Sequence, residues 1–295
     1  MNVTVGTFVH NEEANIRYHL ERWLYQTLPP DIRIVEIIVV ADGCTDQTVP
    51  IVRQIQKSSS LVRLIEVRVR RGITPLLNII LREAKGDILV LQPGDTLPSL
   101  NCIAYLTRHF RHPTVGAVIG KAEPNNDPRT LFGYAAHLLY EWNYLPEIVQ
   151  VDFEGGAAIR KKVISAIPET LVDNEAYIHK TIVDAGYRVV HEPLANAVNK
   201  GPDNIGDFLR QRRRNLFMHL QVRRVGARSP HSEISTVLRL FLREARANPR
   251  TMPRLAILAA LSGISYIGAL YDLATGTSHM KWQMIGSTKS IAKPR

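Results

Sequence analysis

Two largely apolar runs in the chain each end in a turn that carries an aspartate. Residues 88–91 (ILVL) form one run, which stops at Pro93-Gly94 and is followed by Asp95. Residues 35–40 (VEIIVV) form the other run, and Asp42 follows it. Such runs are typical of strands buried on both faces, and Pro-Gly cannot continue a strand. Open α/β sheets bind ligands beyond the carboxyl ends of their strands, so we expect Asp42 and Asp95 to lie at a ligand site.

A carboxylate at such a position can hold a divalent cation. Mg²⁺ and Mn²⁺ are bound in many sites by one or two carboxylates together with the phosphates of a substrate. Asp95 is therefore our candidate ligand for Mg²⁺ or Mn²⁺. The alternative is that Pro93-Gly94-Asp95 is an ordinary surface turn.

Strand-like and helix-like segments alternate through the first half of the chain and would position these acids. We expect strands at residues 3–9, 35–40, 61–69, 86–91 and 115–119, and helices at 11–25, 48–56, 74–85 and 99–110. This alternation predicts right-handed βαβ units, and therefore an α/β fold with a mixed, mostly parallel sheet. No G-x-G-x-x-G pattern follows the first strand, which argues against a Rossmann dinucleotide site.

The chain is basic, with a formal net charge of +10 over 295 residues. The basic residues crowd between residues 210 and 254, which predicts a localised contact with an anionic partner such as a phosphorylated substrate or a lipid surface. No known nucleic-acid motif accompanies this segment, so we expect no nucleic-acid partner. The two cysteines, Cys44 and Cys102, cannot form a disulfide framework or a zinc cluster, and they suit a reducing compartment.

Together with further motifs, the segments around Asp42 and Asp95 resemble those of the family-2 glycosyltransferases. These are inverting enzymes with a GT-A fold that use nucleotide-diphosphate sugars. The resemblance runs from about residue 3 to residue 220, and no motif is specific alone. The matching segments occur in the family's order at residues 9–13 (VHNEE), 39–46 (VVADGCTD), 70–78 (RRGITPLLN), 94–96 (GDT), 154–160 (EGGAAIR), 174–175 (NE), 186–189 (GYRV) and 211–215 (QRRRN). The last segment is similar to a motif of the membrane-associated, cellulose- and chitin-synthase-like branch.

The resemblance implies a GT-A-type nucleotide-sugar-binding domain over residues 1–222 and a membrane-associating helical region over 223–295. It also implies roles for individual side chains. Contacts with the nucleotide sugar are expected from Asn11, Glu13, Asp42, Arg70, Arg71 and Asn78. Contacts with the acceptor or the diphosphate are expected from Gly155, Gly156, Gln211, Arg213 and Arg214, with Arg212 beside them. Asp95 would bind the metal ion.

An inverting transfer needs a base that removes the proton of the acceptor hydroxyl. Glu175 occupies the position of the family's catalytic aspartate, and Asp173 is the competitor for the same role. The alternative is that both are acids at a helix N-terminus, where the helix dipole favours them.

The chain departs from the family's pattern at four positions. Ala41 and Pro93 each replace an Asp, Ile73 replaces a Lys and Asn215 replaces a Trp. With fewer carboxylates, the phosphates must complete the metal shell, and we do not predict a long-chain polymerase. A nucleotide-sugar-binding scaffold protein with a degenerate, inactive metal site is the alternative function.

The C-terminal region has the pattern of a membrane-surface protein. Residues 234–246 (ISTVLRLFLREAR) are basic and amphipathic, which suits an anionic bilayer, although a surface helix of the soluble domain has the same pattern. Residues 255–271 are apolar and predict an interfacial or re-entrant helix, with one membrane span as the alternative. We therefore expect the cytoplasmic face of the cell membrane and a lipid or lipid-linked glycan acceptor. The tail, with Trp282 and residues 287–289, is expected to fold back toward the site.

Overall fold

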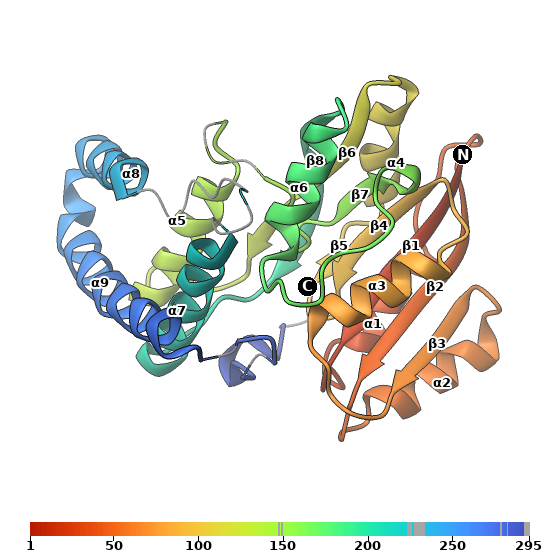
Figure 1. Cartoon of the computed structure of the whole chain (residues 1–295), viewed down its shortest axis with the longest axis horizontal. Helices are drawn as coiled ribbons and strands as arrows, with labels where there is room; N and C mark the ends of the chain where they lie inside the picture. Colours follow the sequence, from red (N-terminus) through yellow and green to blue (C-terminus); the bar gives the residue numbers. More distant parts are fainter. Residues whose placement is uncertain are drawn as a thin grey trace.

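The computed structural model describes residues 1–291 except 147, 149, 223–225, 227–233, 278 and 282. Within these residues the strands form one eight-stranded sheet in the order β3-β2-β1-β4-β7-β6-β8-β5 (Figure 1). The strands are β1 (Asn2–Val9), β2 (Arg33–Asp42), β3 (Val62–Val67), β4 (Ile88–Pro93), β5 (Leu97–Pro98), β6 (Val115–Pro124), β7 (Ala157–Arg160) and β8 (Arg188–Asn199).

The sheet is mixed and mostly parallel. Strands β3, β2, β1 and β4 run parallel to one another, and β6 is parallel to β8. Strand β7 is antiparallel to both β4 and β6, and β5 is antiparallel to β8. The predicted fold class is thus confirmed.

Helices cover both faces of the first four strands. They include α1 (Ile16–Leu24), α2 (Thr48–Ser58), α3 (Ile73–Glu83), α4 (Cys102–Thr107) and α6 (Asn174–Asp184). Neighbouring residues of a strand point to opposite faces, and β2 shows this directly. Val39 packs in the cluster with α1, α2 and α4, whereas Val40 packs in the cluster with α3 and α6. Coverage on both sides explains why these strands are apolar throughout.

Three elements differ from their predicted bounds by more than shifts of a few residues at their ends. The helix expected from residue 11 begins at Ile16, because Asn11 has a φ of 53° and the backbone turns before the helix starts. The helix expected over 99–110 is divided into α4 and a 3₁₀ turn, η1 (Arg108–Arg111). The strand expected over 115–119 continues to Pro124, because its second half pairs with β8, where Lys121 lies opposite Asn196.

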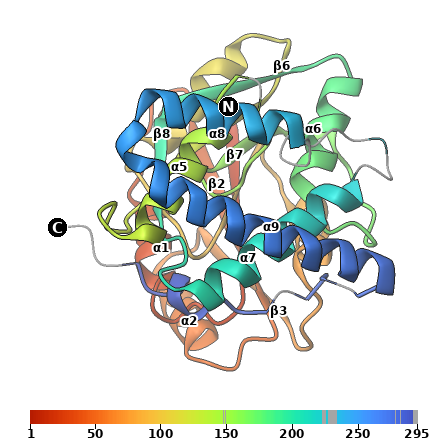
Figure 2. The same cartoon turned by 90° about the vertical axis from the view of Figure 1, so that its left-hand side faces the viewer.

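Helix α5 and the C-terminal helices gather at the end of the molecule away from β3 (Figures 1 and 2). This group contains α5 (Leu131–Asn143), α7 (Ile205–Val222), α8 (Ile234–Ala247), η5 (Pro249–Thr251) and α9 (Met252–Thr275). Leu138 of α5 packs with Leu240 of α8 and Leu255 of α9. Phe217 of α7 packs with Ala269 of α9. The predicted division of the chain after residue 222 stays a prediction.

After α9 the chain returns toward the sheet, where the N–H of Ile291 donates to the side chain of Asn15 over 3.2 Å. We call residues 279–291 the C-terminal strap; it contains the 3₁₀ turn η6 (Gly286–Thr288), and Trp282 within it lies outside the described residues. At Gly72 the strap passes so close that a Cβ atom would lie 2.1 Å from the carbonyl oxygen of Met280. Any side chain at residue 72 would therefore push the strap away.

Candidate active site

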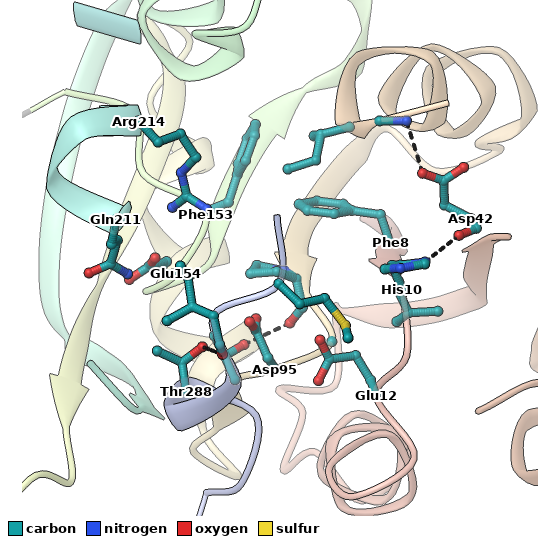
Figure 3. A pocket seen from close by; sticks show the side chains of 18 of the residues that line it. Phe8, His10, Glu12, Asp42, Asp95, Phe153, Glu154, Gln211, Arg214 and Thr288 are labelled. Atoms are coloured by element: carbon teal, nitrogen blue, oxygen red, sulfur yellow. Dashed lines mark hydrogen bonds between the residues drawn. The ribbon is translucent and has the colours of Figure 1, made fainter. Parts of the chain in front are cut away.

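A cavity lies where β1, β2 and β4 end, between the sheet, α7 and the C-terminal strap (Figure 3). Asp42, Asp95 and Glu175 all line it, although they come from three distant parts of the chain. The predicted site residues that line the cavity are Asp42, Arg70, Asp95, Glu175, Gln211 and Arg214. The strap adds Thr288 and Lys289, as expected for residues 287–289.

Asp95 is half-buried, and its carboxylate is available to a ligand. The turn that holds it is closed by Thr96, whose Oγ1 donates to the carbonyl of Pro93 over 2.9 Å. Within the described residues, the Asp95 carboxylate makes no hydrogen bond and no ion pair. Figure 3 shows the carboxylates of Glu12 and Asp95 on the same side of the cavity.

The Asp95 carboxylate could bind a divalent cation only if the phosphates of a substrate supplied further ligands. Among the described residues, no cluster of three or more His, Cys, Asp or Glu side chains could hold a metal ion. Mg²⁺ and Mn²⁺ sites that use one carboxylate complete their shell with phosphate oxygens and water. The free Asp95 carboxylate is compatible with such a shared site.

Glu12 is an acidic residue that lines the cavity with Asp95 and that we did not predict as a site residue. It is buried, and burial, followed by the charge of Asp95, raises its pKa to about 8. Its carboxylate forms an ion pair with the ammonium of Lys289 in the strap. The late start of α1 explains the omission, because Glu12 precedes the helix and faces the cavity instead of lying on a helix surface.

Asp42 is buried at the end of β2. Its Oδ1 accepts a hydrogen bond from the backbone N–H of Arg71 over 2.7 Å, and its Oδ2 accepts one from Gly72 over 2.9 Å. Its carbonyl accepts a hydrogen bond of 2.6 Å from His10 Nδ1. Asp42 thus fixes the loop after β3, and each carboxylate oxygen still has a lone pair for a nucleotide.

A second acidic group forms the far wall of the cavity. Glu154 Oε2 accepts hydrogen bonds from the Tyr140 hydroxyl and from Asn199 Nδ2, the latter over 2.7 Å. Burial and the nearby Asp152 raise the pKa of Glu154 to about 8. These residues were also missed, because our prediction took only the glycines from the segment that Glu154 begins.

The two candidate bases occupy different environments. Glu175 lies in the first turn of α6, and its Oε1 accepts a hydrogen bond from the backbone N–H of Phe153 over 2.8 Å. Burial, followed by the charge of Asp152, raises the pKa of Glu175 well above that of an ordinary glutamate. Asp173 caps α6 by accepting from the N–H of Ala176 over 3.0 Å, and it does not line the cavity.

Helix α7 contributes two polar side chains to the cavity and directs a third elsewhere. Gln211 and Arg214 are three residues apart, so they share a face, and both point into the cavity (Figure 3). Burial lowers the pKa of Arg214 to about 10. Arg213 lies outside the cavity lining, because its guanidinium binds Asp272 of α9 over 2.6 and 2.5 Å. Arg212 is also outside the lining, and burial lowers its pKa to about 10.

The remaining predicted residues shape the surrounding loops without lining the cavity. Asn11 Oδ1 accepts from the N–H of Thr45 over 2.8 Å, and Glu13 Oε2 accepts from the N–H of Gln47 over 2.9 Å. These two bonds hold the turn after β1 against the turn after β2. Asn78 exchanges two hydrogen bonds of 2.8 Å with the backbone of Ile167.

Arg71, Gly155 and Gly156 also lie outside the lining. The Arg71 guanidinium is 3.4 Å from the carboxylate of Glu169. Gly156 has a φ of 88°, and its carbonyl accepts from the N–H of Gly120 over 2.8 Å. A Cβ atom at Gly155 would lie 2.4 Å from the carbonyl oxygen of Gly120, so close backbone contact requires a glycine at residue 155, whereas the positive φ favours one at residue 156.

Residues 4–167, which are 164 of the 295 residues, match the model of the family described as glycosyl transferase family 2. The chain belongs to this family. The expected resemblance to the family-2 glycosyltransferases and their GT-A fold is confirmed.

Among curated relatives, the chain is similar to the probable glycosyltransferase YdaM of Bacillus subtilis. The two are 24% identical over 231 residues, which cover 72% of this chain and 54% of YdaM. It is also 24% identical over 191 residues to the poly-β-1,6-N-acetyl-D-glucosamine synthase of Staphylococcus aureus, covering 60% of this chain and 45% of the synthase. The chain therefore spans about half the length of these relatives.

Solved structures of this fold are also similar to the whole chain. The mannosyltransferase PcManGT from Pyrobaculum calidifontis, solved in complex with GDP-Man and Mn²⁺, gives a TM-score of 0.63 at 22% identity, with 94% of this chain and 88% of that chain covered. Residues 1–349 of S. aureus TarS give a TM-score of 0.54 at 15% identity, with coverage of 95% and 93%. These likenesses support the fold.

Proposed function

We propose that this protein is an inverting glycosyltransferase that moves a sugar from a nucleotide-diphosphate sugar to an acceptor hydroxyl at a membrane surface. One observation carries the proposal: the free carboxylate of Asp95 and the half-buried Glu175 line the same cavity. The first is the group that a metal-bound diphosphate requires, and the second is the group that an acceptor hydroxyl requires.

Asp95 would hold Mg²⁺ or Mn²⁺ together with the diphosphate of the donor. The bound ion would neutralise the negative charge that develops on the departing diphosphate. The chain's own contribution on this side is to orient the nucleotide. Asp42 fixes the loop that carries Arg70, and Arg70 and His10 line the cavity beside it. The mannosyltransferase complex with GDP-Man and Mn²⁺, which has the same fold, supports this arrangement.

Glu175 would act as the base. The acceptor oxygen forms a bond to the sugar's anomeric carbon while the bond from that carbon to the diphosphate oxygen breaks, and the hydroxyl proton passes to Glu175. The hydrogen bond from Phe153 N–H leaves the second carboxylate oxygen of Glu175 for this task. Arg214 faces the same space, where its charge would stabilise phosphate.

The exposed face of α9 supports the proposal that the acceptor lies at a membrane surface. One face of this helix, including Leu258, Leu261 and Ala269, is buried against the protein, whereas Ile264 and Ile267 are 58% and 69% exposed. In the described part of the chain, the stretch Pro249–Thr275 is the one helix long and apolar enough to cross a membrane. Because one face of α9 packs on α5 and α7, we propose that the helix lies in the bilayer interface on the cytoplasmic side.

The arginines of α8 supply the charge for an anionic surface. Arg239, Arg243 and Arg246 are exposed along this helix, beside the exposed Leu238 and Leu242. Basic residues beside exposed apolar ones suit a bilayer with anionic headgroups. The acceptor would then be a lipid or a lipid-linked glycan, presented at the surface on which α8 and α9 lie.

The decisive experiment uses the purified full-length chain, Mn²⁺ and a panel of radiolabelled nucleotide sugars, incubated with native membranes. Transfer of label into the lipid extract or into a glycan, lost in Asp95→Asn, supports the proposal. Binding of a nucleotide sugar without hydrolysis or transfer, unchanged by Asp95→Ala, supports the alternative of a scaffold protein with an inactive site.

A further inference from the structure

The direction of the Asp95 carboxylate is set by the backbone of the turn that carries it. Within the described residues this side chain makes no hydrogen bond of its own, so no other group aims it. The turn is closed by Thr96 Oγ1 on the carbonyl of Pro93, and the N–H of Gly94 donates to the carbonyl of Phe8 over 3.3 Å. A further contact comes from outside the sheet and meets the carbonyl of Thr96.

His19 of α1 supplies this contact. Its Nδ1 lies 2.7 Å from the carbonyl oxygen of Thr96, and the two residues are 0% and 1% exposed. A carbonyl that is buried away from water needs a donor from the protein. The bond therefore joins the middle of α1 to the turn after β4, although 77 residues separate them.

Trp23, one turn further along α1, determines which nitrogen of the His19 ring carries the proton. Its indole Nε1 lies 3.1 Å from His19 Nε2. An indole N–H can only donate, so Nε2 accepts and the proton of the neutral ring is on Nδ1. Burial lowers the pKa of His19 to about 4, which is consistent with a neutral ring. The hydrogen bonds thus run in one direction, from Trp23 to His19 and from His19 to the carbonyl of Thr96.

These bonds bear on Asp95 because it precedes Thr96 in the chain. Without a donor at His19 the buried carbonyl of Thr96 would be unpaired, which is costly unless the turn rotates toward another partner. Such a rotation would carry the Asp95 carboxylate with it. A site with one carboxylate depends on the direction of that group, and residues that orient a metal ligand typically change metal affinity by 10–100-fold.

We propose that His19 is a positioning residue for Asp95, and that its Nδ1–H fixes the turn that aims this carboxylate at the cation and the diphosphate of the donor. His19 does not line the cavity, so it acts only through the turn. The sequence gave no sign of this role, because His19 lies on the buried face of α1 with Ile16 and Trp23. The inference rests on the proposed function, which assigns the metal ion to Asp95.

Calorimetric titration of the full-length chain with UDP, GDP, ADP and dTDP, with and without Mn²⁺, tests the proposal without turnover. The quantity compared is the factor by which Mn²⁺ lowers the Kd of the diphosphate that binds. His19→Leu is expected to reduce this factor by about tenfold or more and to leave the Kd without Mn²⁺ within about twofold. Adding His19→Leu to Asp95→Asn should cause no further loss, because both changes act on the same ligand.

Two amide variants separate the two nitrogens of the His19 ring. His19→Asn can place an N–H near the position of Nδ1, so it should retain the effect of Mn²⁺ within about threefold. His19→Gln can still accept from Trp23 but has no donor at that position, so it should show the loss, and it replaces His19→Leu if that variant does not fold. Leu20→Ala is the matched control, since this buried neighbour on α1 packs in the core and has no polar atom to offer the turn.

A wild-type effect of Mn²⁺ in folded His19→Leu or His19→Gln overturns this inference and leaves the proposed function standing. An equal loss in Leu20→Ala also overturns it, because any loosening of α1 would then have the same result. If Mn²⁺ does not lower the Kd of the wild type, both the metal role of Asp95 and this inference are wrong. If the wild type binds none of the diphosphates, the proposed function itself is wrong.

Discussion

Arg213 of α7 binds Asp272 of α9 through two side-chain hydrogen bonds of 2.6 and 2.5 Å. Asp272 is almost fully buried, and it also lies 2.9 Å from His279 Nε2. The next residue of α7, Arg214, lines the cavity. One turn of α7 therefore joins the candidate active site to the helix that we propose lies on the membrane.

This relationship favours a structural role for Arg213, whereas the sequence motif predicted a role at the diphosphate. Arg213→Met is expected to lower the free energy of unfolding by about 1–3 kcal/mol, because it leaves the buried Asp272 carboxylate with a weaker set of partners. The KM for the donor should change by less than about twofold. Chemical denaturation and steady-state kinetics measure the two effects.

Arg214→Met is the matched comparison, since the two arginines are adjacent. It should raise the donor or acceptor KM, because its guanidinium faces the cavity. A large rise in KM for Arg213→Met with unchanged stability would restore the role that the sequence motif suggested for Arg213.

Asp95→Asn is expected to remove metal-dependent turnover without unfolding the chain. Because the Asp95 carboxylate has no hydrogen bond or ion pair in the described structure, its loss should leave stability within about 0.5 kcal/mol. Turnover should fall by about 10²-fold or more, as for loss of a group that stabilises developing charge. The measurement is activity over a range of Mn²⁺ concentrations, with Asp184→Asn, an exposed partner of Lys180, as the control. Normal activity in Asp95→Asn at every Mn²⁺ concentration would remove Asp95 from the mechanism.

The positions of the aspartates could be predicted because they depend on local signals. Apolar runs mark strands, and a Pro-Gly turn marks where a strand stops, so Asp42 and Asp95 were expected at one edge of the sheet. The insertion of the antiparallel strand β7 between β4 and β6 was not predicted. The order of strands depends on long-range pairing, which the periodicity of a sequence does not encode.

The pairing of Glu12 with Lys289 had no sequence signal that fixed it, since 277 residues separate the two. Strap residues 287–289 were expected near the site, but neither the ion pair nor the hydrogen bond between Asn15 and Ile291 follows from residue spacing. Asp173 and Glu175 show that residue spacing also fails to predict side-chain contacts between residues close in sequence. Both are acids at the start of a helix, and only the structure shows that one caps the helix while the other lines the cavity.

Glu175→Gln is expected to lower turnover by about 10²–10⁴-fold, the usual loss for a general base. Folding should be retained, because the Gln carbonyl can still accept from Phe153 N–H. Asp173→Asn should keep both turnover and stability, since Asn is as good a helix cap as Asp, whereas Asp173→Ala should cost about 1 kcal/mol of stability. Steady-state kinetics and thermal unfolding of the three variants separate the roles. If Glu175→Gln stays active and Asp173→Asn is inactive, the base is Asp173.

The raised pKa of Glu175 predicts that turnover increases with pH. A base acts only when deprotonated, so activity should be low below the folded-state pKa of Glu175 and rise as pH passes through it. Burial is the main cause of the shift, and Asp152, Asp173 and Glu154 add to it, while Arg214 faces the same space. The native state also holds this proton more tightly than the unfolded state, so its contribution to stability is present at low pH and is lost as pH rises.

A pH-rate profile and thermal unfolding over the same pH range test both statements. The rise in turnover should move to lower pH in Asp152→Asn, which removes the charge that raises the pKa of Glu175 most after burial. The part of the stability that declines with rising pH should be smaller in Glu175→Gln. A profile in which turnover is complete at the pKa of an ordinary glutamate would show that Glu175 is not the base.

The exposed apolar face of α9 predicts binding to anionic vesicles. The wild type should sediment with phosphatidylglycerol vesicles more than with phosphatidylcholine vesicles, and salt should weaken this binding because it screens the α8 arginines. Replacement of Ile264 and Ile267 by Glu should reduce binding by about tenfold or more, since two large apolar side chains no longer enter the interface. Both side chains are exposed, so the fold should be retained.

The matched control replaces Val183 and Leu194 by Glu, because these are 50% and 54% exposed but lie on α6 and β8. The control should bind vesicles as the wild type does, because these residues are remote from α8 and α9 in sequence and belong to the sheet domain. Equal loss in both double variants would mean that added negative charge, and not the α9 face, weakens the binding. Vesicle binding by the control together with its loss in the α9 variant would place the acceptor side of the cavity at a lipid surface, since α7 connects that cavity to α9 through Arg213 and Asp272.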